Sequence, residues 1–484
     1  MKKLLLLIAG FAILSFTGVN AQFFNLTVID GYGSGSYEAG DTVHIWSEAY
    51  DNTKTFSTWS GDIQYLESPK EWHTTLIMPN QNVSVTAVTS NMPAYTINQE
   101  QIMGAANLKN VYSYFPTNLN GVIYLFHGTG GNASNWINTL EYRSFINAAI
   151  AVDFGIIVTE AEEITLNTDL NGDGKLRWQA FPIDTVNGID YLNIKALTDT
   201  FVNRGDLSYS IPRFSVGMSN GGSFSAAISY AFNYQAGISY CASSVQAIFG
   251  VRNNPFAFRM AKYDDNAEVG PQGNYEAWQN DSILGSRGVC HDYEIHGRQP
   301  IYPQRFARIP GISTTVSQSI FNNLSTNNQL DSDNYALHSD TIKNHILLNP
   351  SLYPAIISLS PSLQVEALNQ IAASNAEHKF YSDYNFETLD FIINRCSVTG
   401  NLNEISSEQN DLIIYPNPAD EQIRFDLPEG DYSLRIFNSI GQRVFYLDGV
   451  NDLTTVDVRE FRNGIYTIQV TNKKASLVSK WIKQ

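Results

Sequence analysis

Along the middle of the chain, short continuously apolar segments alternate with longer segments whose apolar residues recur every three or four positions. The first pattern is typical of strands buried on both faces of a parallel sheet, and the second of helices that cover such a sheet. The pattern therefore predicts an α/β domain with a doubly wound sheet over residues 93–397, with helices such as 140–151. The expected strands are 121–126, 154–159, 213–217, 236–241 and 256–261.

Both ends of the chain show another pattern, in which apolar and polar residues alternate and Gly, Pro and Asn interrupt the runs. This is typical of small antiparallel β modules. We expect a β module at 22–92 and a β-sandwich at 411–484, with a linker at 398–410. Residues 1–21 contain two lysines, an apolar stretch and a small residue at the end, which predicts a secretory signal peptide.

Composition and charge narrow the classes of partner. The 484 residues are 43% hydrophobic, enough for about three domains with large cores. Basic residues number 30 and acidic residues 47, so the net charge is −17. This argues against binding to nucleic acid or to anionic membranes, because both require basic patches. After the signal peptide, no segment is long and apolar enough to be expected to span a membrane.

The chain has three cysteines, Cys241, Cys290 and Cys396. In an exported protein they permit one disulfide and leave one cysteine over. Their spacing does not resemble that of metal ligands, and it does not decide which two of them pair.

The first candidate for chemistry is Ser219, at the centre of a Gly-Met-Ser-Asn-Gly sequence between an expected strand and an expected helix. A serine on so sharp a turn leaves no room for Cβ atoms two residues away on either side, which explains the two glycines. Such a nucleophile elbow also presents the N–H group of the next residue, Asn220, to an oxyanion. A second N–H group is expected near Thr129, in the His-Gly-Thr-Gly-Gly loop after the strand at 121–126. A phosphate-binding loop is disfavoured there, because no Gly-Lys-Ser/Thr follows.

An elbow serine requires a histidine base and an acid that orients it, in the chain order serine, acid, histidine. His378 lies in a polar loop just before the last expected helix of the domain and is the candidate base. The acid should follow the strand at 256–261, which favours Asp264 and leaves Asp265 as the alternative. The segment 299–370 separates acid and base and is expected to form a helical cap.

A further polar segment matches the start of a calcium-binding loop at Asp169, Asn171 and Asp173, although its twelfth position holds alanine rather than glutamate. A bound structural calcium and a simple Gly-Asp turn are the two alternatives. No cofactor is required for the chemistry of the serine. The next residues, Arg177 and Trp178, are candidates for lining an acyl pocket.

Three motifs carry a resemblance to a known family: HGTGGNASNW from residue 127, GMSNGG from residue 217 and EHKFYSDYN from residue 377. Over about residues 111–396 the chain resembles the polyhydroxybutyrate depolymerase, feruloyl esterase and acetyl xylan esterase branch of the α/β-hydrolases. The resemblance implies a serine esterase. Two departures concern the substrate: the acid segment lacks the usual His-Gly before its aspartate, and 299–370 has no counterpart.

The terminal modules also resemble known families. A glycine-rich stretch at 31–40, Trp-Ser-Gly-Asp from residue 59 and Met-Pro-Asn from residue 78 resemble an internalin-type bacterial repeat. Tyr-Pro-Asn-Pro at 415–418, a Gly-Gln turn, Gly-Ile-Tyr-x-Ile-x-Val at 464–470 and a basic end resemble the sorting domain of the type IX (Por) secretion system. The second resemblance implies export across an outer membrane by the type IX secretion machinery and removal of the tail.

These features predict a secreted or cell-surface serine esterase, exported through the periplasm, that acts on esters of a polymer or plant carbohydrate through an acyl-enzyme. Two alternatives stay open: a serine peptidase on the same fold, and a surface glycan-binding protein whose hydrolase domain is inactive. In the second case Trp46, Trp59 and Trp72 of the N-terminal module would be exposed and stack on sugar rings; otherwise they are core residues of a small sandwich.

Overall fold

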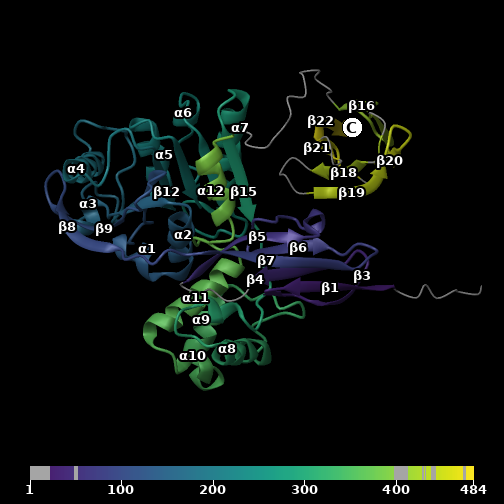
Figure 1. Cartoon of the computed structure of the whole chain (residues 1–484), viewed down its shortest axis with the longest axis horizontal. Coiled ribbons are helices and arrows are strands. Elements are labelled where there is room, and N and C mark those ends of the chain that lie inside the picture. The colour runs from purple at the N-terminus through teal and green to yellow at the C-terminus, as the bar shows by residue number, and fades with distance from the viewer. Residues whose placement is uncertain are drawn as a thin grey trace, which may run out of the picture. The chain divides into compact units, whose positions relative to one another are not determined.

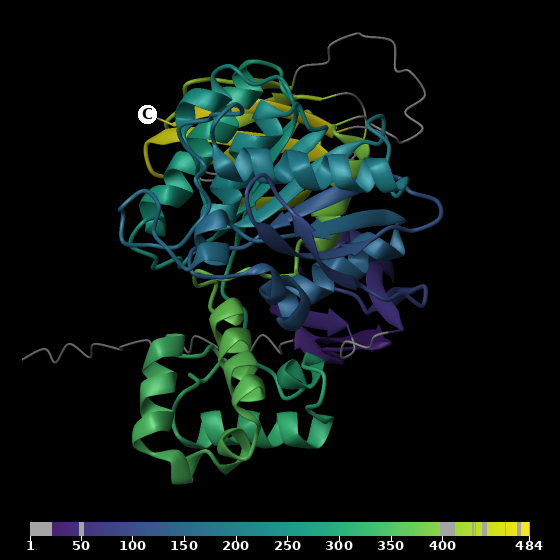
Figure 2. The same ribbon diagram turned by 90° about the vertical axis from the view of Figure 1, so that its left-hand side faces the viewer.

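The computed structural model describes residues 22–47, 53–396 and, within 412–483, all residues except 428–429, 431, 438–442, 460 and 472–475. The chain divides into two compact units between residues 397 and 398. The first unit contains an N-terminal β module, an α/β domain and a helical cap (Figures 1 and 2). The predicted signal peptide at 1–21 and linker at 398–410 lie outside the described residues.

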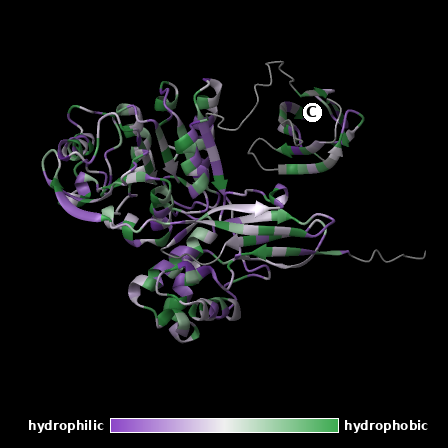
Figure 3. Ribbon diagram, in the orientation of Figure 1, coloured by the Kyte–Doolittle hydropathy of each residue, from purple (hydrophilic) through white to green (hydrophobic). Residues whose placement is uncertain are grey.

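The N-terminal module is built from short strands. Its elements are β1 (Phe23–Ile29), β2 (Gly31–Tyr32), β3 (Gly35–Glu38), β4 (Thr42–Ser47), β5 (Lys54–Gly61), the 3₁₀ helix η1 (Ile63–Tyr65), β6 (His73–Ile77) and β7 (Val83–Asn91). They form two sheets with strand orders β3-β1-β7-β5 and β2-β4-β6. Hydrophobic and hydrophilic residues are mixed along these strands (Figure 3), and Leu26, Val28 and Trp59 face the core of the module.

The α/β domain is organised around one sheet of eight strands. These are β8 (Asn98–Met103), β9 (Leu108–Tyr114), β10 (Gly121–Phe126), β11 (Phe154–Val158), β12 (Arg213–Met218), β13 (Ala236–Tyr240), β14 (Phe256–Ala261) and β15 (His291–His296). Their spatial order is β15-β14-β13-β12-β10-β11-β9-β8. Strand β9 pairs antiparallel with both β8 and β11, and the other pairs are parallel. This is an α/β-hydrolase sheet, so the predicted fold class is confirmed.

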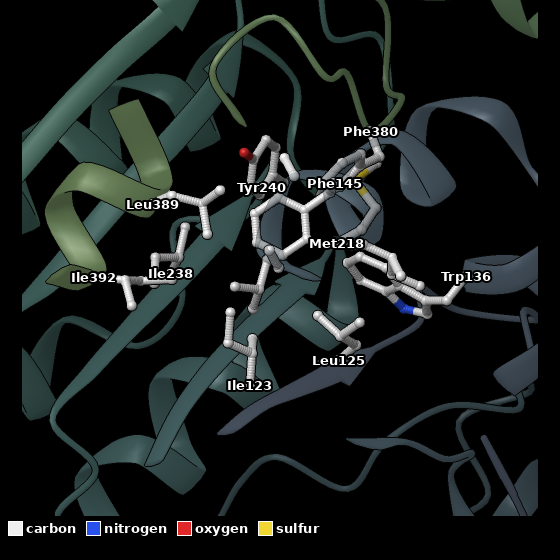
Figure 4. Packing of buried hydrophobic residues seen from close by; sticks show 14 of the residues in the cluster. Ile123, Leu125, Trp136, Phe145, Met218, Ile238, Tyr240, Phe380, Leu389 and Ile392 are labelled. Carbon is white, nitrogen blue, oxygen red and sulfur yellow. The ribbon is translucent and has the colours of Figure 1, made fainter. Parts of the chain in front are cut away.

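Helices cover both faces of the sheet, because the central strands are apolar on both sides. In β10, Ile123 and Leu125 belong to one core cluster, whereas Val122, Tyr124 and Phe126 belong to the other. Figure 4 shows part of the first cluster, where side chains of β10 and β13 meet those of α1, α2 and α12. The helices are α1 (Ala133–Asn138), α2 (Leu140–Ala151), α3 (Glu162–Leu166), α4 (Ile189–Arg204), α5 (Asn220–Ala231), α6 (Gln246–Phe249), α7 (Gly270–Ser286) and α12 (Asn385–Asn394).

The cap lies in the sequence between β15 and the loop that carries His378. Its elements are η2 (Arg305–Arg308), α8 (Thr314–Thr326), α9 (Ser339–Leu348), η3 (Pro350–Leu352), α10 (Pro354–Ile357) and α11 (Pro361–Ser374). They enclose a core of their own, which includes Ile320, Ile342 and Ile371. A disulfide joins Cys290 to Cys396 and leaves Cys241 free and buried, which answers the pairing that the sequence left open.

The N-terminal module packs directly against the cap (Figures 1 and 2). The rings of Trp46 and Tyr302 are stacked with centroids 3.9 Å apart, and the Arg308 guanidinium lies 3.8 Å from the centre of the Trp72 ring. Trp59 is a core residue of the module, which agrees with the alternative that the tryptophans are buried in a small sandwich. Trp46 and Trp72 instead contact the cap. Trp59 and Trp72 are buried and Trp46 is half-buried, so none of the three is exposed as sugar stacking would require.

The second unit is a β-sandwich, as predicted. Its strands are β16 (Ile413–Tyr415), β17 (Gln422–Asp426), β18 (Tyr432–Phe437), β19 (Arg443–Val450), β20 (Thr455–Asp457), β21 (Gly464–Thr471) and β22 (Ser476–Lys483). They form two sheets with strand orders β16-β17-β20 and β19-β18-β21-β22. The core between them includes Ile423, Leu434, Ile468 and Trp481.

Candidate active site

Ser219 occupies a sharp turn between β12 and α5. Its backbone has φ 55° and ψ −126°, a conformation that costs free energy for any residue other than glycine. A Cβ atom at Gly217 would lie 1.9 Å from the carbonyl oxygen of Gly221, and one at Gly221 would lie 2.4 Å from that of His127. Only glycine fits at both positions, so the elbow is specified by the local sequence.

The structure brings Ser219, His378 and Asp264 together. Nε2 of His378 lies 2.8 Å from Oγ of Ser219, and Nδ1 of His378 lies 2.6 Å from Oδ2 of Asp264. Asp264 is 2% exposed, and its other carboxylate oxygen accepts the N–H group of Asn266 at 2.9 Å. The imidazole therefore lies between a hydroxyl group and a buried carboxylate, which is the geometry of a nucleophile, base and orienting acid.

The alternative acid, Asp265, has another partner. Its side chain is exposed, and its Oδ2 lies 2.9 Å from Nε2 of His338, at the start of cap helix α9. Of the two adjacent aspartates, Asp264 contacts His378 and Asp265 contacts the cap.

The expected oxyanion loop follows β10 and touches the serine: a Cβ atom at Gly128 would lie 3.3 Å from the Cβ of Ser219. The N–H groups of Gly130 and Gly131 donate to the carbonyl oxygens of Leu176 and Gly128. Within the described residues, the Thr129 N–H has no acceptor, so this donor is free for a substrate oxygen. The Asn220 N–H belongs to the first turn of α5, where no helical carbonyl accepts it.

Trp178 hydrogen-bonds to both segments that form the expected oxyanion site, a role that the sequence did not indicate. Its backbone N–H donates to Oδ1 of Asn220 at 2.8 Å, and its indole Nε1–H donates to the carbonyl oxygen of His127 at 3.0 Å. The side chain is 1% exposed, and its ring is stacked on that of Phe224. The expectation that Arg177 and Trp178 line the acyl pocket is therefore wrong, since neither faces it.

His127 fixes the conformation of the oxyanion loop. Its Nε2 accepts the N–H group of Ala161 at 3.1 Å, so the proton of the neutral ring is on Nδ1, which donates to the carbonyl oxygen of Gly128 at 2.7 Å. Burial lowers the pKa of His127 to about 4. The ring is therefore neutral at physiological pH.

The predicted calcium ligands take part in local hydrogen bonds. Both carboxylate oxygens of Asp169 accept backbone N–H groups at 2.7 Å, and Oδ1 of Asn171 accepts the N–H group of Asp173 at 2.9 Å. The Arg177 guanidinium lies 2.5 Å from the Asp173 carboxylate and provides a positive charge beside it. Calcium binding by this loop stays a prediction. In the described part of the chain, one group of three potential metal ligands lies close enough together to share an ion. It consists of Cys241, Asp264 and His378, and it does not include the residues of this loop.

Cys241 lies beside Asp264 and His378 but is not a candidate nucleophile. Its Sγ is 3.5 Å from the carbonyl oxygen of Lys379, and the side chain is completely buried. Burial, assisted by the charge of Asp264, raises the pKa of the thiol well above its usual range. The thiolate form required for attack is therefore not populated.

A cavity of about 510 Å³ opens at Ser219. Tyr142, Met218 and Phe380 form an apolar wall, which continues into the aromatic part of the core in Figure 4. Asn135, Thr139 and Asn369 provide polar groups. The charged residues that line it are Glu141, Lys175, Glu268 and Lys379.

Two segments of the chain match known families. Residues 413–484 match the secretion system C-terminal sorting domain, and residues 26–91 match the divergent InlB B-repeat domain. Both resemblances expected from the sequence are thereby confirmed, and the sorting domain indicates an exported protein. The comparison with curated proteins gives no match.

Solved structures of hydrolases are similar to less than half of the chain. A predicted CIB-like hydrolase from Thermoplasma acidophilum is 12% identical, covers 45% of this chain and 96% of its own length, and has a TM-score of 0.31. A dienelactone hydrolase from Anabaena variabilis is 14% identical, with 46% and 94% covered and a TM-score of 0.32. A ferulic acid esterase is 11% identical, with 42% and 90% covered and a TM-score of 0.30.

The chain thus combines an α/β-hydrolase fold with an internalin-type repeat and a secretion sorting domain. None of the helices in the described residues has the length and apolar character needed to cross a bilayer.

Proposed function

We propose that the protein is an exported serine esterase that cleaves its substrate through an acyl-enzyme. The observation that carries the proposal is the continuous hydrogen-bonded path from Oγ of Ser219 through His378 to Asp264, with distances of 2.8 and 2.6 Å. The strained turn that presents Ser219 supports it, because such strain is retained where the surrounding structure requires it.

In the proposed mechanism, Oγ of Ser219 attacks the ester carbonyl carbon while Nε2 of His378 accepts its proton. The Asp264 carboxylate stabilises the imidazolium that forms. The N–H groups of Thr129 and Asn220 stabilise the oxyanion of the tetrahedral intermediate. The alcohol leaves with the proton held by His378. Water then attacks the acyl-enzyme by the same steps and releases the acid.

The proposed substrate is an ester linked to a polymer or a plant carbohydrate. Export supports this choice, because a large substrate cannot enter the cell, and the type IX machinery would deliver the enzyme through the periplasm to the cell surface or medium. The apolar wall of Tyr142 and Phe380 beside polar asparagines suits an acyl group with an apolar body and a polar partner. Binding energy from the remote part of such a substrate can be used in the transition state.

A fluorophosphonate probe and a panel of chromogenic substrates test this function. The wild type should be labelled and should hydrolyse p-nitrophenyl esters, and Ser219→Ala should do neither. Turnover of aminoacyl or dipeptidyl amides without turnover of esters would instead support a serine peptidase. Absence of labelling in the wild type would favour a glycan-binding protein with an inactive hydrolase domain. Feruloylated sugars, acetylated xylan and short polyhydroxybutyrate would then separate the substrate classes.

A further inference from the structure

The acidic residues that line the catalytic cavity are neutralised by neighbouring cations. Glu141 pairs with Arg308, whose Nη1 lies 2.8 Å from its Oε1. Glu268 pairs with both Lys175 and Arg177, at 2.5 and 3.1 Å. Neither carboxylate therefore presents an uncompensated negative charge to a substrate.

Lys379 differs from these residues. It follows His378 directly in the chain, lines the cavity and is exposed. Its backbone is fixed, because its N–H group donates to the carbonyl oxygen of Glu377 and its carbonyl oxygen is 3.5 Å from Sγ of Cys241. Across the described ranges, no carboxylate lies within salt-bridge distance of its ammonium group. The charge of Lys379 acts on the Glu366 carboxyl group at a distance. That carboxyl group accepts hydrogen bonds from a backbone N–H group and an asparagine amide instead.

We infer that Lys379 recognises a carboxylate on the substrate, separate from the ester that reacts, so the preferred substrates are esters whose acyl or alcohol part carries this negative charge. The inference rests on the proposed esterase function and specifies its substrate class. An unpaired cation beside the base is notable in a chain with a net charge of −17, which repels anions at long range. A lysine acts as a point charge and can reach carboxylates in several positions.

Two esters of equal chain length test the inference: p-nitrophenyl hexanoate and the mono-p-nitrophenyl ester of adipic acid, which has a terminal carboxylate in place of the methyl group. The measured quantity is the ratio of kcat/KM for the charged ester to that for the neutral ester, after subtraction of the spontaneous rate. Lys379→Gln should lower this ratio about two- to fivefold, the range for an exposed ion pair. The loss should lie mainly in KM, because the ion pair forms equally in the ground and transition states.

Three controls test whether the charge of Lys379 at the cavity causes the change in the ratio. Lys379→Arg keeps the charge and should retain the ratio, and Lys343→Gln removes an exposed lysine on α9, outside the cavity, and should not change it. Salt at about 0.5 M should lower the ratio for the wild type more than for Lys379→Gln. An unchanged ratio in Lys379→Gln, or an equal loss in Lys379→Arg, would overturn the inference. If the wild type hydrolysed neither ester, or Ser219→Ala hydrolysed both as fast, the proposed function itself would be wrong.

Discussion

Replacing Arg308 by methionine removes the guanidinium that joins the cap to Glu141 of the α/β domain. The two side chains are 7% and 3% exposed, and Nη2 of Arg308 also donates to Oγ of Ser382 at 2.9 Å. Burial alone would raise the pKa of Glu141, but the charges of Arg308 and Arg305 outweigh it and lower the pKa from 4.5 to about 2. This shift corresponds to about 3 kcal/mol of stability, present above about pH 4.5 and lost as the pH falls towards 2.

In the Arg308→Met variant, Glu141 keeps its hydrogen bonds from Gln370 and Ser382, but its remaining cationic neighbour is the more distant Arg305, whose Nη2 is 3.9 Å from its Oε1. We expect the free energy of unfolding to fall by about 3–5 kcal/mol, because a buried carboxylate loses its closest cation. Urea unfolding of the full chain at pH 7.5, followed by tryptophan fluorescence, measures the loss. Arg204→Met is the matched control: Arg204 also lies 2.8 Å from a glutamate, Glu100, but these side chains are 43% and 24% exposed. It should cost less than about 1 kcal/mol.

A second substitution, Glu141→Gln, distinguishes the effect of the unpaired Glu141 charge on stability from the effect of the packing lost with Arg308. The double variant with Arg308→Met should be less destabilised than the sum of the two single variants, because no unpaired charge remains buried. Additive effects, or a loss for Arg308→Met as small as that for Arg204→Met, would refute the reasoning.

Three further substitutions test other parts of the first unit. His378→Ala should lower kcat about 10³- to 10⁶-fold in steady-state ester assays, whereas His338→Ala should keep most of the activity; the reverse order would contradict the proposed base. The free energy of unfolding should fall by up to about 3 kcal/mol as the pH drops from about 6.5 to about 4, because folding holds His127 neutral. Urea titrations at several pH values should show a weaker dependence for His127→Asn, and equal dependence would count against this origin. Trp72→Ala should lower the free energy of unfolding of the first unit by about 3–5 kcal/mol, measured by calorimetry. The control is Trp278→Ala, because Trp278 is half-buried. A loss no larger than that of the control would mean that the N-terminal module is only a spacer.

The central strands could be predicted from the sequence because burial on both faces removes polar residues from them. The edge strands β8 and β15, and β9 next to β8, could not, because none of the three is buried on both faces. All positions of β15 except the last are half-buried, and its sequence His-Asp-Tyr-Glu-Ile-His shows no strand period. A strand of this kind is stabilised by its neighbour in the sheet and not by a local pattern.

The elbow at Ser219 was also predictable, since the close approach between Gly217 and Gly221 is a constraint among residues near in the chain. The support of the oxyanion site by Trp178 was not. It depends on the side-chain amide of Asn220, 42 positions away. The same limit applies to Trp46 and Trp72: their apolar character predicts burial, but the residues that bury them belong to the cap.

The two adjacent aspartates show the same limit of sequence-based prediction at the candidate active site. From the sequence, Asp264 and Asp265 are nearly equivalent, because both follow β14 in the same turn. The fold distinguishes them through the histidine that each one contacts: His378 follows the last cap helix, and His338 caps the N-terminus of α9. The turn after β14 therefore holds the candidate base with one carboxylate and the cap with the next. A displacement of the cap would act on Asp265, the residue beside Asp264, so the position of the cap and the geometry of the proposed catalytic site are coupled through a single peptide bond.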